Sequence, residues 1–263
     1  MGNDGQGLDF EEKLRAIVSD IHSNLEALSV VLADIRSRGV TDILCLGDVV
    51  GYGPEPKECI DIVSELGPCI LGNHDEATLF ETEADYFNYR ARAAIEWTRE
   101  QLEDVRDSER NGPRWAFLGE LERTKSENGV LFVHGSPRNP VKEYIFPEDV
   151  IYNPEKMASI FSRFEGTCFI GHTHIPGVFT EDQMYYSPQD IESSYSITSK
   201  KAIVNVGSVG QPRDGIADAS YALFDGKQVT FCRVPYDYRK TMRKIYNIPA
   251  LDKDLADRLA EGR

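Results

Sequence analysis

All five histidines of this 263-residue chain lie in short polar motifs that can hold a metal ion. The motifs are Ser19-Asp20-Ile21-His22, Gly72-Asn73-His74-Asp75, Val133-His134-Gly135 and Gly171-His172-Thr173-His174, and Leu46-Gly47-Asp48 adds a further carboxylate. Imidazole, carboxylate and amide oxygen together suit borderline divalent ions such as manganese, iron, zinc or nickel. Because no cysteine lies in these motifs, they do not describe a structural thiolate zinc site. An open site of nitrogen and oxygen ligands points to hydrolytic chemistry.

The elements that must position these motifs are short apolar strands. Residues 14–18, 43–46 and 69–71 read as strands, and helices are expected between them. Ser23 and Glu26 form a capping-box pattern at the start of the first helix, which Gly39 ends, and the second helix is expected over residues 55–66. Strands and helices that alternate at this pace predict a parallel sheet with right-handed crossovers.

Polar side chains follow the carboxyl ends of these strands. Asp20, Asp48 and Asn73 each come just after one strand, and His134 and His172 follow apolar runs at 130–133 and 168–170. Ligands of open α/β sheets gather at that edge, so we expect these segments to converge.

The spacing within two motifs gives a further expectation. Asp20 and His22 are two residues apart, as are His172 and His174, so on extended chain the members of each pair face the same side. A lone Asp-x-His is weak evidence, because either residue can serve as a satisfied polar group at a strand end. The succession of such motifs after apolar strands favours a site.

The rest of the chain predicts more strands and two uncertain connections. Strand-like runs occur at 177–180, 202–206, 221–224 and 229–234, with an Asp225-Gly226 hairpin turn between the last two. Residues 76–128 are charged and helix-prone, and residues 136–151 read as an irregular, proline-containing loop. Both segments follow strands that carry metal motifs, so they either overhang the rim and shape a substrate site or are ordinary connections.

Composition restricts the partners. A formal net charge of −15 argues against broad nucleic-acid binding and against anionic membranes. A phosphate ester can still bind, because two divalent ions invert the local field. Five cysteines without metal-type spacing indicate buried free thiols in a reducing, cytoplasmic compartment. No apolar run is long enough to span a membrane.

The domain organisation is expected to be simple. Residues 1–10 lack a signal-peptide pattern and are expected to form a disordered tail. Residues 11–240 are expected to form one domain, and residues 241–263 a charged helical tail.

The order of the motifs from residue 20 to residue 174 resembles that of the calcineurin-like metallophosphoesterase family. The resemblance implies a four-layer α/β/β/α sandwich with mixed sheets and a dinuclear metal site at the strand ends. It assigns one metal to Asp20, His22, Asp48 and His174, and the other to Asp48, Asn73, His134 and His172, so that Asp48 bridges the two ions. Manganese is the first expectation, with iron, zinc or nickel as alternatives. A metal-activated hydroxide would attack phosphorus. His74 matches the family's catalytic histidine, which protonates the departing alkoxide or stabilises charge at phosphorus.

This chain also departs from part of the family. Protein Ser/Thr phosphatases carry Gly-Asp-x-x-Asp-Arg-Gly, whereas Gly51 and Tyr52 stand here in place of the second Asp and the Arg. Both the orienting partner of the catalytic histidine and a phosphate-binding cation are therefore missing, and Asp75 is the only carboxylate next to His74.

Residues 205–214 look like the corresponding segment of small bacterial phosphodiesterase-like members of the family. Arg213 in this segment is a substrate-binding candidate that could replace the missing arginine, and Asn205 could hydrogen-bond behind the ligands. The alternative for this segment is a Gly-rich turn with Arg213 in a surface ion pair.

The resemblance implies metal-dependent hydrolysis of a small phosphodiester or a nucleotide. Phosphoprotein dephosphorylation and diadenosine polyphosphate hydrolysis remain open alternatives. A non-catalytic scaffold of the same fold, or a metal-bound regulator with negligible turnover, is a rival from another functional class. The sequence leaves open the physiological substrate, the native metal, the preference for mono- or diesters and the oligomeric state.

Overall fold

The computed structural model describes residues 14–263, and the predicted tail at residues 1–10 lies outside this range. The strands are β1 (Arg15–Val18), β2 (Asp42–Cys45), β3 (Thr124–Glu127), β4 (Val130–Val133), β5 (Thr167–Ile170), β6 (Gly177–Thr180), β7 (Tyr185–Tyr186), β8 (Ser194–Ser196), β9 (Ala202–Asn205), β10 (Ala219–Phe224) and β11 (Gln228–Val234). The helices are α1 (Leu25–Ser37), α2 (Pro56–Val63), α3 (Asn73–Leu79), η1 (Glu81–Tyr86), α4 (Tyr89–Leu102), η2 (Val105–Asp107), α5 (Ser108–Gly119), α6 (Asp149–Tyr152), α7 (Pro154–Phe161), α8 (Tyr238–Tyr246) and α9 (Asp254–Glu261), where η marks a 3₁₀ helix.

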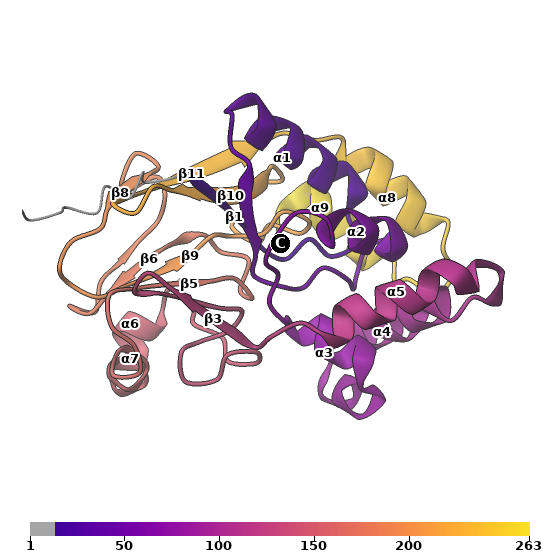
Figure 1. Ribbon diagram of the computed structural model, residues 1–263, viewed down its shortest axis with the longest axis horizontal. Helices are drawn as coiled ribbons and strands as arrows, with labels where there is room; N and C mark the ends of the chain where they lie inside the picture. The colour runs from indigo at the N-terminus through magenta and orange to yellow at the C-terminus, as the bar shows by residue number, and fades with distance from the viewer. Residues whose placement is uncertain (1–13) are drawn as a thin grey trace, which may run out of the picture.

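Two sheets pack face to face between helices (Figure 1). One sheet has the strand order β2-β1-β10-β11-β8, and the other has the order β3-β4-β5-β9-β6-β7. Both are mixed: β1 runs parallel to β2, and β5 runs parallel to β4 and β9, whereas β10 and β6 join their neighbours antiparallel. The expected α/β class with four layers and mixed sheets is confirmed.

The core lies between the two sheets and is formed by the apolar runs that the sequence predicts as strands. Ile17 and Leu44 of one sheet pack with Phe132 and Phe169 of the other, and the two phenylalanine rings stack with centroids 5.6 Å apart. Helix α1 covers the outer face of the first sheet and α7 that of the second (Figure 1). Strands covered on both faces need apolar side chains on both, which is why they read as unbroken apolar runs.

Some local expectations need correction. The segment at residues 69–71 forms only isolated bridges, Cys45 with Cys69 and Ile70 with Glu122, instead of a full strand. The cap of α1 is Asn24, whose side-chain oxygen accepts a hydrogen bond from the amide of Ala27, and not the predicted Ser23. Ser23 has φ 53° and donates its own amide to the carbonyl of Val49, because it belongs to the turn that carries His22.

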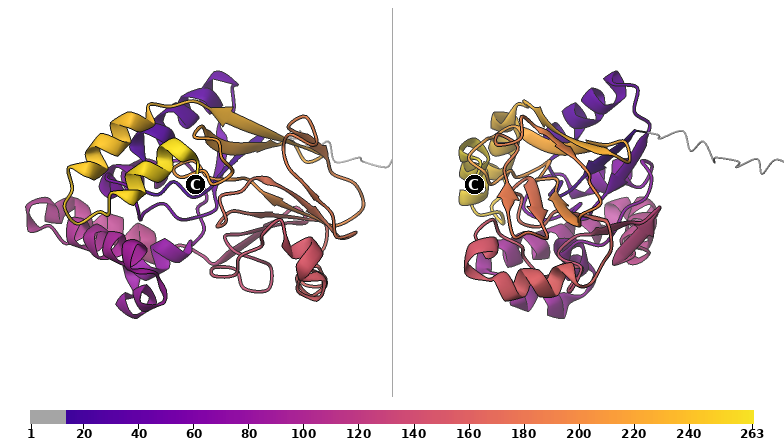
Figure 2. Two further views of the ribbon diagram at one scale, coloured as in Figure 1. Left: turned by 180° about the vertical axis from the view of Figure 1, so that it is seen from behind. Right: turned by 90° about the vertical axis from the view of Figure 1, so that its left-hand side faces the viewer.

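The C-terminal helices α8 and α9 lie on the same side of the molecule as α1 and α2 (Figure 2). Ile245 of α8 and Leu255 and Leu259 of α9 pack in one cluster with Tyr52, which lies in the loop between β2 and α2. The segment predicted as a helical tail thus contacts a loop that follows a metal motif, and the domain boundary at residue 240 stays a prediction. None of the helices within residues 14–263 combines the length and the apolar character that crossing a bilayer requires.

Candidate metal centre and active site

The structure brings the predicted ligands together at the carboxyl ends of the strands. Their atoms form three buried groups, in each of which the potential ligand atoms lie within 4.8 Å of one another. The groups are Asp20, His22 and His174; His22, Asp48 and His74; and Asp48, His134 and His172. The expectation that these strand ends converge on one place is therefore confirmed.

The backbone reaches this arrangement through left-handed turns. The φ angles are 54° at Asp20, 49° at His22, 52° at Asp48, 67° at His172 and 63° at His174. Side chains do not alternate on such a backbone, so the expectation that His172 and His174 face the same side is wrong. His174 joins the Asp20 group and His172 joins the His134 group. Left-handed conformations cost energy for residues with side chains and are concentrated at functional sites.

The hydrogen bonds of His22 and His174 define which nitrogen of each ring carries the proton. Nδ1 of His22 lies 3.0 Å from the carbonyl oxygen of Val50, and Nδ1 of His174 lies 2.6 Å from that of Gln211. Because a carbonyl only accepts, both Nδ1 atoms are donors in the neutral rings. The two Nε2 lone pairs then face each other at 3.1 Å. Two lone pairs repel at this distance unless a cation lies between them.

The same pattern occurs in the second group. His134 directs Nδ1 to the carbonyl oxygen of Leu46 at 2.9 Å, and His172 directs Nε2 to that of Lys142 at 3.3 Å. The free nitrogens, Nε2 of His134 and Nδ1 of His172, lie 3.1 Å apart, with Oδ1 of Asn73 3.0 Å from the former. Main-chain carbonyls that orient imidazole rings in this way are typical of metal-binding histidines.

Asp48 connects the two groups. Its Oδ2 lies 3.3 Å from Nε2 of His134 and 3.6 Å from Nε2 of His22. Its Oδ1 accepts a hydrogen bond of 2.8 Å from the amide of His74. Oδ1 of Asp20, which is buried, has no hydrogen-bond donor within residues 14–263. Carboxylate oxygens that face imidazole nitrogens in a buried space fit divalent cations, so this set of ligand atoms is consistent with a dinuclear site.

The protonation of three of the four rings agrees with this interpretation. Burial lowers the pKa of His22 and of His174, and it lowers the pKa of His172 to about 3, so these rings are neutral near pH 7. Burial acts in the same direction at His134, but the Asp48 carboxylate outweighs it and raises the pKa of His134 to about 9. Without a bound cation, His134 therefore carries a proton on Nε2 beside the shared carboxylate, at the place where a metal ion would replace it.

His74 lies against the ligand groups but makes different contacts. Its ring packs at 4.4 Å from Tyr52, 4.8 Å from His22 and 4.9 Å from Phe87, measured between centroids. Burial lowers its pKa to about 4, and its Nδ1 has no hydrogen-bond partner within the described residues. A Cβ atom added at Gly51 would lie 2.4 Å from this Nδ1. The glycine thus leaves room for the histidine ring.

Asp75 does not orient His74, although it follows it in the sequence. Its carboxylate accepts main-chain hydrogen bonds from Asp48 at 2.8 Å, Val49 at 3.0 Å and Gly72 at 3.1 Å, and from Val50 at 3.2 Å. Asp75 therefore holds the turn that carries Asp48. The sequence analysis did not predict this role. It could have been inferred from the position of Asp75 in the first turn of α3, where a carboxylate can accept hydrogen bonds from free main-chain amides.

The segment after β9 supports the centre from the other side. Asn205 donates to the carbonyl of Gly171 and to Oγ1 of Thr173, both at 2.7 Å, and so holds the turn between His172 and His174. Arg213 donates to Oε1 of Gln211 at 2.7 Å, and its guanidinium lies 5.7 Å from the centroid of Tyr52. No carboxylate within residues 14–263 forms an ion pair with Arg213, which disagrees with the surface ion pair considered from the sequence.

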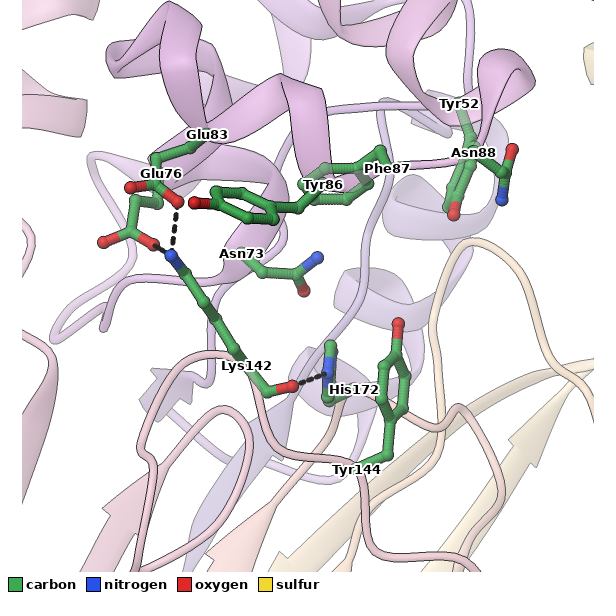
Figure 3. A pocket seen from close by; sticks show the side chains of 10 residues that line it. All are labelled: Tyr52, Asn73, Glu76, Glu83, Tyr86, Phe87, Asn88, Lys142, Tyr144 and His172. Atoms are coloured by element: carbon green, nitrogen blue, oxygen red, sulfur yellow. Dashed lines mark hydrogen bonds and ion pairs between the residues drawn. The ribbon is translucent and has the colours of Figure 1, made fainter.

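A cavity of about 230 Å³ opens beside His172 and Asn73 (Figure 3). Four aromatic rings line it, together with Glu76, Glu83, Asn88 and Lys142; the rings are Tyr52, Tyr86, Phe87 and Tyr144. Apart from Tyr52, these residues come from the two connections whose role the sequence left open, residues 76–128 and 136–151. Both connections therefore reach the rim and form walls of the cavity.

Comparisons with known proteins agree with the geometry. Residues 14–228 match the calcineurin-like phosphoesterase superfamily domain. An uncharacterized protein of Methanocaldococcus jannaschii is 39% identical over 258 residues, which cover 94% of this chain and 98% of that protein. The crystal structure of a metallophosphoesterase from Sphaerobacter thermophilus is 38% identical, with a TM-score of 0.80 and coverage of 95% of this chain and 99% of that one. A hypothetical protein from Pyrococcus horikoshii, 20% identical with a TM-score of 0.70, shares the fold over 95% of this chain and 98% of its own. The chain thus belongs to the calcineurin-like phosphoesterase superfamily.

Proposed function

We propose that the protein hydrolyses a small phosphate ester, a phosphodiester or a nucleotide, with the help of two divalent metal ions, manganese first among them. The observation that carries this proposal is the pair of ligand groups that share Oδ2 of Asp48, each with two imidazole nitrogens directed at one another. When bound, two such ions lower the pKa of a shared water to about 7 and bind the phosphate oxygens.

The proposed ligands follow the two groups. Asp20, His22, Asp48 and His174 hold one ion, and Asp48, Asn73, His134 and His172 hold the other. The short distances within each group and the carbonyl contacts that orient the rings support this division.

His74 is proposed to contact the leaving oxygen, by donating a proton or a hydrogen bond to it. Tyr52, His22 and Phe87 surround its ring and keep it beside the ligand groups. Arg213 is proposed to bind the phosphate group. Its position over Tyr52 supports this, because Tyr52 occupies the place of the arginine found in the protein phosphatases.

The lining of the cavity beside His172 suits a small and uncharged organic group of the substrate. Lys142 is the one cation among its lining residues, and it forms ion pairs with Glu76 and Glu83 (Figure 3). No lining cation is therefore left to receive a second phosphate group. The aromatic walls suit a ring, as a nucleotide would supply. The cavity volume of about 230 Å³ is below the ~300–1,000 Å³ typical of pockets that hold drug-sized ligands, so the cavity suits a small group.

The test is turnover of bis-p-nitrophenyl phosphate and p-nitrophenyl phosphate with manganese. We expect metal-dependent release of nitrophenol that is lost in Asp48→Asn, together with bound metal measured by elemental analysis. Asp182→Asn is the matched control, because this side chain is 58% exposed and its ion pair with Lys200 lies outside the ligand groups. Absence of metal-dependent turnover on every phosphate ester would contradict the enzymatic proposal.

A second panel separates the alternatives. It contains a cyclic nucleotide, diadenosine tetraphosphate and a phosphopeptide, assayed at the same metal concentration. We expect the cyclic nucleotide to give the highest kcat/KM. A preference for the phosphopeptide or for the dinucleotide would replace the proposed substrate class, and bound metal without turnover would favour a scaffold or regulator.

A further inference from the structure

Tyr144 lies on one of the proposed metal ligands. Its ring stacks on the imidazole of His172, with centroids 3.7 Å apart and an angle of 19° between the planes. Phe146 lies parallel to Tyr144, with centroids 5.4 Å apart. The position of the tyrosine ring is therefore tied to the position of the metal centre.

The loop that carries Tyr144 is anchored on both sides of the ring. Before it, the carbonyl of Lys142 faces Nε2 of His172 at 3.3 Å. At Tyr144 itself, the main-chain carbonyl accepts a hydrogen bond of 2.8 Å from Nζ of Lys156. After it, the amide of Phe146 donates to Asp149 at 2.8 Å. These contacts hold the main chain on both sides of Tyr144.

The hydroxyl of Tyr144 points into the cavity, on the side that Tyr52 lines (Figure 3). This hydroxyl has no hydrogen-bond partner within residues 14–263, and 40% of the residue is exposed. A tyrosine hydroxyl is protonated at neutral pH, so a donor points towards Tyr52, whose ring contacts His74 and lies beneath the guanidinium of Arg213.

We propose that Tyr144 binds the substrate directly, by donating a hydrogen bond from its hydroxyl to an oxygen of the phosphate group. The inference rests on the proposed function, because that function puts a phosphate ester above the ligand groups. Hydrogen bonds from hydroxyl groups to anionic oxygens are short and strong. Tyr144 would bind the same phosphate group as Arg213, which lies in the segment after β9.

The alternative is a purely structural role, in which the ring of Tyr144 only shields His172. In that case the ring matters and the hydroxyl does not. Tyr144→Phe removes the hydroxyl and keeps the ring, whereas Tyr144→Ala removes both. Tyr152→Phe is the matched control: Tyr152 lies in α6, eight residues further on, and 76% of it is exposed outside the cavity.

The hydroxyl is tested by two measurements on each variant. We expect Tyr144→Phe to lower kcat/KM for bis-p-nitrophenyl phosphate by about 10-fold to 100-fold. Calorimetric titration with inorganic phosphate in the presence of manganese should show weaker binding by a similar factor. Metal content and Tm should equal those of the wild type, and Tyr152→Phe should behave as wild type in every respect.

The proposal is overturned if Tyr144→Phe equals the wild type in turnover and in phosphate binding while Tyr144→Ala alone loses metal or activity. It is also overturned if inorganic phosphate does not bind the manganese-loaded wild type. A wild type that binds phosphate but turns over no ester would contradict the proposed function, and the titration would still decide whether Tyr144 holds the phosphate.

Discussion

The Nε2 atoms of His22 and His174 lie 3.1 Å apart, and each ring has its Nδ1 on a main-chain carbonyl. The residues are 152 positions apart in the chain, so this contact exists only in the folded protein. It directs two lone pairs at each other in a buried space beside Asp20. A cation between these atoms turns the repulsion into two bonds, so metal binding should stabilise the fold.

The first prediction concerns metal removal. Manganese added to protein that was treated with a chelator should raise Tm, because the ion binds the folded state and not the unfolded chain. The gain is about 2.7 kcal/mol at a free ion concentration roughly 100-fold above Kd. Scanning calorimetry measures it. Asp48→Asn should show a smaller increase, and an equal increase in this variant would mean that the ion binds elsewhere.

Gly51→Ala should lower kcat while the metal content stays unchanged. The new Cβ atom would lie 2.4 Å from Nδ1 of His74, and φ at Gly51 is +92°, so either the ring or the backbone must move. Gly112→Ala is the control, because a Cβ atom at Gly112 meets nothing within 4 Å. Steady-state kinetics measures kcat, and elemental analysis measures the metal content. Normal turnover in Gly51→Ala would show that the position of His74 does not matter for catalysis.

Asp75→Asn should weaken metal binding by about 10-fold to 100-fold, the range found when groups that orient ligands are replaced. The amide has one acceptor oxygen where the carboxylate serves the amides of Asp48, Val49, Val50 and Gly72. Calorimetric titration with manganese measures the effect. Asp85→Asn, at a carboxylate that is 63% exposed, should bind metal as the wild type does. Equal affinities in both variants would remove Asp75 from this role.

Arg213→Ala should raise KM for bis-p-nitrophenyl phosphate and leave both metals bound, because the guanidinium is proposed to contact the phosphate group and not the ions. Arg213→Lys should recover part of the loss, since it keeps the charge without the planar fork. Arg163→Ala, at an exposed arginine after α7, is the control. Kinetics of Arg213→Ala that match the wild type would take this residue out of the substrate site.

A further prediction uses the pH dependence of stability. Burial opposes ionisation of Glu26, but hydrogen bonds to Lys244 at 2.6 Å and Lys240 at 3.0 Å outweigh it and lower the pKa to about 2, from an ordinary value of 4.5. A lowered pKa in the folded state stabilises the protein above the unfolded pKa, and this stabilisation is lost as the pH falls towards the folded pKa. Glu26→Gln should therefore lower Tm at pH 7.

The loss of Tm in Glu26→Gln should shrink as the pH falls from 4.5 towards 2. Thermal unfolding at several pH values measures it, with Glu65→Gln as a control at an exposed carboxyl. A difference between wild type and Glu26→Gln that does not change over this range would contradict the assigned pKa.

The sequence by itself determined most of the strands and the polar residues that follow them, although residues 69–71 form only isolated bridges and β3, β7 and β8 were not predicted. Runs such as residues 130–133 are apolar because the sheets are covered on both faces, and that requirement acts locally on each strand. The order of the motifs from Asp20 to His174 was sufficient to identify the family and its layered fold. Asn205 was also predicted correctly as a support behind the ligands, since it ends a strand at the same edge.

Only the tertiary structure decided how the backbone brings these residues together. Local alternation predicted one side for His172 and His174, whereas the family resemblance assigned them to different ions. Left-handed turns direct them to different groups. The carboxylate of Asp75, next to His74 in sequence, serves the loop of Asp48, and Tyr144 reaches His172 from an irregular loop. These contacts depend on backbone turns and on distances between remote segments. A pattern of neighbouring residues carries no information about either.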